Sequence, residues 1–170
     1  MKKLILLILV SFSLSAAAQL RSVTLQASGL TCSMCSNSIF KALKTLDFVE
    51  KVDPDIKNSA FVISFKQGAD ADFDKLKAKV EDAGFFVASF TFVYDFHNLN
   101  ISNDTHVSIG KNVFHFLGIK DRVLNGEVTA RLLDKGFVSA KEYKKNSTLT
   151  KMACYKTGTE AGKRIFHVTI

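Results

Sequence analysis

The order of apolar periodicities in the first half of the chain is the feature that most restricts its fold. Stretches with every second residue apolar predict half-buried strands, whereas apolar residues three and four positions apart predict one face of a helix. This order predicts a ferredoxin-like βαββαβ sandwich, an α+β fold with one antiparallel sheet and two helices on one face. The predicted strands are 22–27, 49–52, 61–65 and 85–94, and the predicted helices begin at Ser36 and Phe73.

Two cysteines, Cys32 and Cys35, lie between the first predicted strand and the first predicted helix, in the stretch GLTCSMC. Two residues of separation allow both sulfurs to converge on one ion. The start of a helix also favours a thiolate, because its unpaired backbone N–H groups stabilise negative charge. By spacing alone, the pair fits a redox switch, half of a zinc site or a trap for a soft metal ion.

The N-terminus indicates where the protein works. Residues 1–18 have the three-part pattern of a secretory signal peptide: two lysines, an apolar run at 4–14 and small residues up to Ala18. The apolar run is shorter than the roughly 20 residues that a membrane-spanning helix needs. We therefore expect cleavage after Ala18, a secreted or periplasmic location, and no membrane span in the mature chain 19–170. That location is oxidising, so a CxxC pair there tends to close into a disulfide.

The stretch GLTCSMCSNSIFKALKTLDFVEKVDPDIKNSAFVISF resembles the heavy-metal-associated domain of copper chaperones, metal-pumping ATPases and a periplasmic mercury-binding protein. The family pattern is GMTCxxC followed by a helix, and the resemblance covers about residues 21–94. It implies that Cys32 and Cys35 are the two metal ligands. It also implies that Leu30 takes the place of a buried methionine, and that Phe85 forms an apolar shield close to the metal.

The two thiols favour a soft ion. Cu(I) prefers thiolate and accepts two or three ligands, whereas structural Zn(II) usually takes four. The same ligand count admits Hg(II) and Ag(I). Zn(II) is a weaker alternative, because family members that favour zinc commonly carry Asp where this chain has Thr31. A two-coordinate ion on a surface loop can accept a third thiolate from a partner protein. We therefore predict a non-enzymatic Cu(I) chaperone or scavenger that exchanges metal with a protein partner.

A thiol-disulfide oxidoreductase that uses the same cysteines is the main alternative. Thioredoxin-like sites usually have an aromatic residue directly before the first cysteine and a cis-proline facing the pair. This chain has no Trp, and its single proline, Pro54, lies in a polar turn far along the chain from the motif. A third hypothesis is a partner-binding scaffold whose first domain no longer depends on metal.

The second half is predicted to be a separate unit. The polar stretch 97–104 predicts a linker between a heavy-metal-associated domain at 19–96 and a second domain at 105–170. Short alternating stretches separated by turns predict a small all-β domain there, such as an OB-type barrel. Residues 19–96 carry nine basic and ten acidic side chains, whereas 97–170 carry twelve and six. We expect a solvated basic face, with an acidic partner or an anionic surface as the alternative. We expect no nucleic-acid partner, because an exported protein rarely meets nucleic acid and no interleaved basic and aromatic motif is present.

The second half also holds soft or borderline metal ligands. Met152 and Cys154 are predicted to project from one face of a strand, and two of the histidines are predicted to lie in the middle of strands. The spacing of these residues matches no metal-ligand pattern, so the sequence leaves open whether any of them form a second site. The residues are Cys154, Met152, His106, His115 and His167, with His97 at the predicted boundary.

Overall fold

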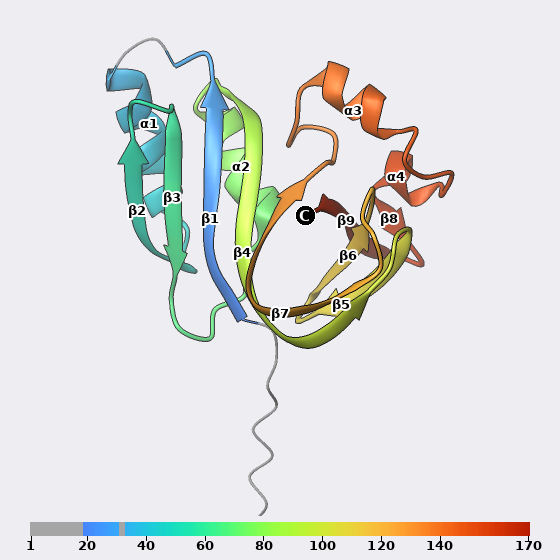
Figure 1. The fold of residues 1–170 in the computed structure, drawn as a ribbon. Coiled ribbons are helices and arrows are strands. Elements are labelled where there is room, and N and C mark those ends of the chain that lie inside the picture. Colours follow the sequence, from blue (N-terminus) through green and yellow to red (C-terminus); the bar gives the residue numbers. More distant parts are fainter. Residues whose placement is uncertain (1–18, 31–32) are drawn as a thin grey trace, which may run out of the picture.

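The computed structural model describes residues 19–30 and 33–170, so the predicted signal peptide lies outside the described residues. Strands and helices follow one another over most of the described chain (Figure 1). The strands are β1 (Gln19–Ser28), β2 (Val49–Asp55), β3 (Ala60–Phe65), β4 (Phe86–Ile101), β5 (Thr105–Ile109), β6 (Asn112–Phe116), β7 (Arg122–Leu132), β8 (Thr159–Glu160) and β9 (Lys163–Thr169). The helices are α1 (Ser33–Lys44), α2 (Phe73–Asp82), α3 (Ala140–Asn146) and α4 (Cys154–Thr157).

The first half has the predicted βαββαβ order. Its strands lie in the sheet order β2-β3-β1-β4, and every neighbouring pair is antiparallel. Both helices cover one face of this part of the sheet (Figure 1). Their apolar faces supply the core: Ile39 and Leu43 of α1 and Leu76 and Val80 of α2 are all buried. The ferredoxin-like arrangement predicted from periodicity is confirmed for this half.

Strand β4 continues past the predicted end of the first half. Residues 97–101, which were predicted to belong to a linker, are the last part of this 16-residue strand, and 99–101 pair with β7. The prediction was wrong there because the outward side chains are polar and because a bulge interrupts the alternation. The pairing register shifts between Phe96 and Leu99, and Asn98 has a positive φ of 51°. Ile101 is nevertheless buried.

The second half extends the same sheet. The strand order continues β4-β7-β9-β6-β5, and β9 runs parallel to β6 and antiparallel to β7. The sheet is open, with β2 at one edge and β5 at the other, so an OB-type barrel is not confirmed. The all-β prediction was wrong in two places, because the short helices α3 and α4 lie where the alternating stretches at 136–143 and 151–156 favoured strands. Ser139 caps α3 by accepting a hydrogen bond from the backbone N–H of Glu142, which favours a helical start over a strand.

One cluster of buried apolar residues runs through both halves. The sheet curves at β4 and β7, so that β9 and β6 turn toward α2 (Figure 1). The ring of Phe73 on α2 lies 5.3 Å from that of Phe166 on β9 and 6.3 Å from that of Phe114 on β6. The core therefore crosses the predicted boundary, while the independent folding of 19–96 and 105–170 stays a prediction.

Candidate functional site

The described residues directly before the CxxC motif are Gly29 and Leu30, and Phe85 lies beside Gly29. Gly29 follows β1 with a φ of 82°, a conformation that residues with a side chain rarely adopt. A Cβ atom at this position would lie 3.9 Å from Cδ1 of Phe85, so the phenylalanine ring lies beside the loop. Leu30 and Phe85 are both half-buried and pack against the core, while the role of Phe85 as an apolar shield of the metal stays a prediction.

Cys35 is the third residue of α1, and its side chain is half-buried. It therefore lies in the first helical turn, where backbone N–H groups without an intrahelical acceptor stabilise a thiolate. The first turn of α1 contains no acidic side chain that would repel it. Cys32, the other predicted ligand, lies outside the described residues, so the convergence of the two sulfurs stays a prediction.

Two exposed apolar side chains flank this loop. Met34, between the two cysteines in sequence, is 79% exposed, and Phe86, at the start of β4, is 71% exposed. Phe86 pairs with Ser28 at the end of β1, directly before the loop.

The structure brings together three of the soft or borderline ligands of the second half. Sγ of Cys154 lies 3.5 Å from Nδ1 of His115 and 3.6 Å from Nε2 of His106. One donor atom from each of the three residues lies within 4.8 Å of the other two. His106 and His115 face each other across the β5–β6 hairpin, and Cys154 is the first residue of α4. The prediction that Cys154 lies on a strand was wrong.

Two other histidines named with this group do not belong to the cluster. His97 is exposed on β4, and His167 supplies no atom to the group with the 4.8 Å spacing. Met152 is half-buried and lies before α4, outside any strand. His167 does lie next to the cluster: its ring is 5.1 Å from that of His115, and the two residues are register partners in the parallel pair of β6 and β9. Both His115 and His167 lie mid-strand, as predicted.

Burial shifts the pKa values of two residues of the cluster, Cys154 and His115. Burial raises the pKa of the Cys154 thiol, and the nearby Glu160 and Asp104 carboxylates raise it further. Burial lowers the pKa of His115, although its hydrogen bond with Asp104 acts in the opposite direction. Both shifts favour the uncharged form, which is a thiol at Cys154 and a neutral imidazole at His115.

A buried carboxylate that the sequence analysis did not single out organises the neighbouring part of β9. Asp134 accepts hydrogen bonds from the backbone N–H and from Nδ1 of His167, at 2.7 and 3.0 Å, and from Nη1 of Arg164 at 3.1 Å. Nε2 of His167 is buried and has no hydrogen-bond partner among the described residues. The network fixes the orientation of the His167 ring beside the cluster.

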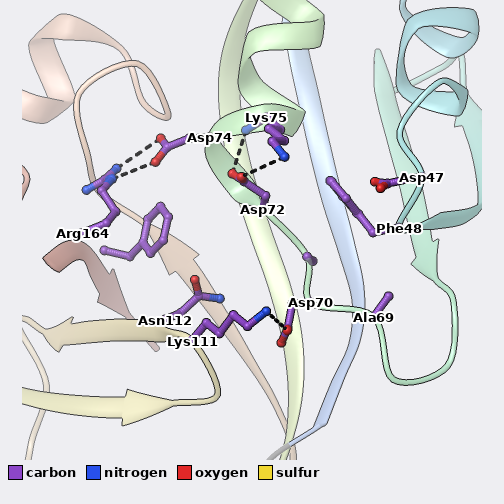
Figure 2. Close-up of a pocket in the computed structure, with 12 residues that line it drawn as sticks. Asp47, Phe48, Ala69, Asp70, Asp72, Asp74, Lys75, Lys111, Asn112 and Arg164 are labelled. Carbon is purple, nitrogen blue, oxygen red and sulfur yellow. Dashed lines mark hydrogen bonds and ion pairs between the residues drawn. The ribbon is translucent and has the colours of Figure 1, made fainter.

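A cleft of about 620 Å³ lies between the two halves (Figure 2). Four of its charged side chains form two ion pairs: Asp70 contacts Lys111 at 2.6 Å, and Asp74 contacts Nε of Arg164 at 2.9 Å. The Asp70 carboxylate raises the pKa of Lys111 through their hydrogen bond. Each pair joins an acidic residue of the first half to a basic residue of the second, so the two ion pairs connect the halves across the cleft.

Comparison with known proteins agrees with the geometry of the first half. Residues 24–86 match the heavy-metal-associated domain. The mercuric transport protein periplasmic component of Pseudomonas fluorescens is 37% identical over 68 residues, which cover 40% of this chain and 74% of that protein. The chain belongs to the heavy-metal-associated domain family. Residues 87–170 lie outside the matched domain.

Two solved structures are similar to the same part of the chain. The yeast copper transporter domain CCC2A is 33% identical, with a TM-score of 0.35, and the match covers 39% of this chain and 90% of that domain. Oxidized MerP from Ralstonia metallidurans is 33% identical, with a TM-score of 0.37, and the match covers 42% of this chain and 96% of that protein. Within the described residues, no helix is both long and apolar enough to cross a membrane.

Proposed function

We propose that this protein is an exported soft-metal carrier or scavenger that binds Cu(I) through Cys32 and Cys35 and passes it to a protein partner. The observation that carries the proposal is the position of Cys35 in the first turn of α1. Leu30, which precedes the motif, and Phe85 both pack against the core. A half-buried thiolate at a helix start can bind a metal while one side of the ion faces the surface.

Cu(I) is preferred on ligand chemistry. Two thiolates satisfy the low coordination number of Cu(I), and a helix N-terminus offsets part of their negative charge. The relative from Pseudomonas fluorescens is named for mercuric transport, so Hg(II) is the second ion to test, with Ag(I) and Zn(II) after it. In all these cases the ion is cargo that the protein takes up and releases.

Export is supported by two observations of different kinds. The first 18 residues have the composition of a signal peptide, and the relative is named as a periplasmic component. An oxidising compartment implies that a disulfide between Cys32 and Cys35 competes with metal uptake. Metal capture therefore requires a reductant or a partner that delivers the reduced protein.

Transfer to a partner is supported by the apolar rim of the loop, formed by Met34 and Phe86. Both side chains are exposed, so a partner loop that carries its own thiolate can pack on them while that sulfur reaches the ion. A shared three-coordinate intermediate lowers the barrier to exchange without weakening equilibrium binding. We expect the rim to govern the transfer rate and the cysteines to govern affinity.

The test is an anaerobic Cu(I) titration of the reduced protein against a competing chelator. In the Cys154→Ser background, which removes the thiol of the second half, the protein should bind one tight equivalent, and this equivalent should be lost when Cys32→Ser and Cys35→Ser are added. Retention of this equivalent by the triple variant would refute the proposal. Turnover of a disulfide substrate would favour the oxidoreductase, and partner binding unchanged in the triple variant would favour the scaffold.

A further inference from the structure

The cluster of His106, His115 and Cys154 has a second layer of partners that determines which atoms face inward. Nε2 of His115 lies 2.8 Å from Oδ1 of Asp104, and Nδ1 of His106 lies 3.0 Å from Oε2 of Glu160. An ionised carboxylate only accepts hydrogen bonds, so each of these ring nitrogens carries a proton. In a ring that carries only this proton, the remaining nitrogen is an acceptor whose lone pair is available.

Both of these acceptor nitrogens face the same sulfur. The thiol of Cys154 has one proton, and it can donate that proton to only one of the two imidazoles at a time. Two imidazole lone pairs therefore face one thiol, whose S–H is a weak donor and can serve only one of them. A cation bound to all three atoms would satisfy every one of them.

The spacing fits a metal ion. With metal–sulfur distances of about 2.3 Å and metal–nitrogen distances of about 2.0–2.1 Å, tetrahedral coordination separates sulfur from nitrogen by about 3.5–3.6 Å. The observed separations are 3.5 and 3.6 Å. Carboxylates that hold the non-ligating nitrogen of a histidine are also a regular feature of metal sites, because they fix the tautomer and raise the basicity of the ligand.

We propose that His106, His115 and Cys154 form a second metal site, which binds a thiophilic divalent transition ion of the zinc class. One thiolate and two imidazoles are ligands that Zn(II) accepts, and three protein ligands leave a fourth position for water. The charge favours a divalent ion, since the thiolate and the carboxylates of Asp104 and Glu160 together carry three negative charges around it. Binding converts the thiol to a thiolate and releases its proton to solvent.

A catalytic thiol is a less suitable interpretation of the same residues. Cys154, His115 and Asp104 do follow the order of a nucleophile, a base and an orienting carboxylate. However, Cys154 is 3% exposed and His115 is fully buried, whereas a nucleophile has to meet its substrate. A nucleophilic thiol also needs only one imidazole as its base. A metal ion, by contrast, can bind the sulfur and both imidazole nitrogens.

This site is separate from the CxxC motif. In the sheet, β4, β7 and β9 lie between β1, which leads into the CxxC loop, and β6, which carries His115. The matched family domain ends at residue 86, before all three ligands of the cluster. The two sites can therefore be tested independently, and neither proposal depends on the other.

The experiment uses the reduced full-length mature chain with Cys32→Ser and Cys35→Ser, so that the first site is absent. Co(II) is added under anaerobic conditions, and Zn(II) is then titrated against the Co(II)-loaded protein and, separately, against a chromogenic chelator. We expect one equivalent of Co(II), with a sulfur-to-cobalt charge-transfer band and the visible bands of tetrahedral Co(II), and displacement by one equivalent of Zn(II). Uptake should release one proton per ion at neutral pH.

Four further substitutions in this background identify the ligands. Cys154→Ser should remove the charge-transfer band, and His115→Gln should remove tight binding. Glu160→Gln changes a half-exposed side chain outside the ligand set, so the fold should persist while affinity falls about tenfold. His97→Gln, which changes an exposed histidine of β4, is the matched control and should leave binding unchanged.

Circular dichroism and thermal unfolding of each metal-free variant separate lost binding from lost folding. A folded parent that shows no charge-transfer band with Co(II) would overturn the proposal. A band that survives Cys154→Ser, or an equal loss of affinity in His97→Gln and Glu160→Gln, would overturn it as well.

Discussion

Replacement of Phe114 by alanine tests whether the two halves of the protein unfold as one unit. Phe114 lies on β6 and is 1% exposed. Its ring lies 5.3 Å from that of Phe92, 5.9 Å from that of Tyr94 and 6.3 Å from that of Phe73. These three partners belong to the first half, so the substitution removes packing from the first half through a residue of the second.

The expected loss is large. A buried phenylalanine replaced by alanine typically costs about 3–5 kcal/mol in the free energy of unfolding, from lost burial and the cavity left behind. For a chain of this size, 1 kcal/mol lowers the melting temperature by about 2–4 °C, which predicts a decrease of roughly 6–20 °C. Ile56→Ala, which changes a 67% exposed side chain in the turn between β2 and β3, should change stability by less than about 0.5 kcal/mol.

Hydrogen exchange measured by mass spectrometry resolves where stability is lost. If the core is shared, peptides from β1 and β3 should lose protection together with peptides from β9 in Phe114→Ala. Loss of protection confined to residues 105–170, with β1 and β3 unchanged, would refute this reasoning. That result would instead support the predicted division at 97–104.

Three further predictions concern single positions. Asp134→Ala leaves the backbone N–H and Nδ1 of the buried His167 without their acceptor, whereas Arg164 keeps Asp74, so chemical denaturation should show a loss of about 3 kcal/mol; a loss below about 1 kcal/mol would contradict the network. Gly29→Ala should cost about 1–2 kcal/mol because of its positive φ, and Gly29→Asn should cost less; equal effects in thermal unfolding would contradict a conformational cause. Met34→Ser combined with Phe86→Ser should slow copper transfer to an acceptor domain in stopped-flow measurements while Cu(I) affinity stays unchanged; reduced affinity would place these side chains in the metal site itself.

The first half could be predicted from sequence because each of its elements buries one regular face. The apolar positions of α2, such as Leu76 and Val80, recur at helical spacing, and β1 alternates cleanly through Val23 and Leu25. The extension of β4 beyond residue 96 could not be predicted from apolar alternation. Its final residues expose asparagines and contain a bulge, and they become a strand only because β7 offers a partner.

The histidine pair carried a signal that the sequence analysis did not use. A two-residue turn at Gly110 and Lys111 would pair Ile109 with Asn112, and the same register places His106 opposite His115. Sequence could therefore have brought two of the three ligands together. Cys154 could not have been added, because its place depends on how α4 packs beneath strands that are distant in the chain.

The position of β9 has a consequence for the order in which the molecule can be assembled. This strand is synthesised after all the others, yet it lies in the sheet between β7 and β6. A chain emerging from the ribosome or from a membrane channel can complete β1 to β4 early. The edge of β6 that pairs with β9 then stays unpaired until β9 has been synthesised. During that interval the β5–β6 hairpin is open to pairing with other chains, so the second half is the part that most needs protection while the protein is being made.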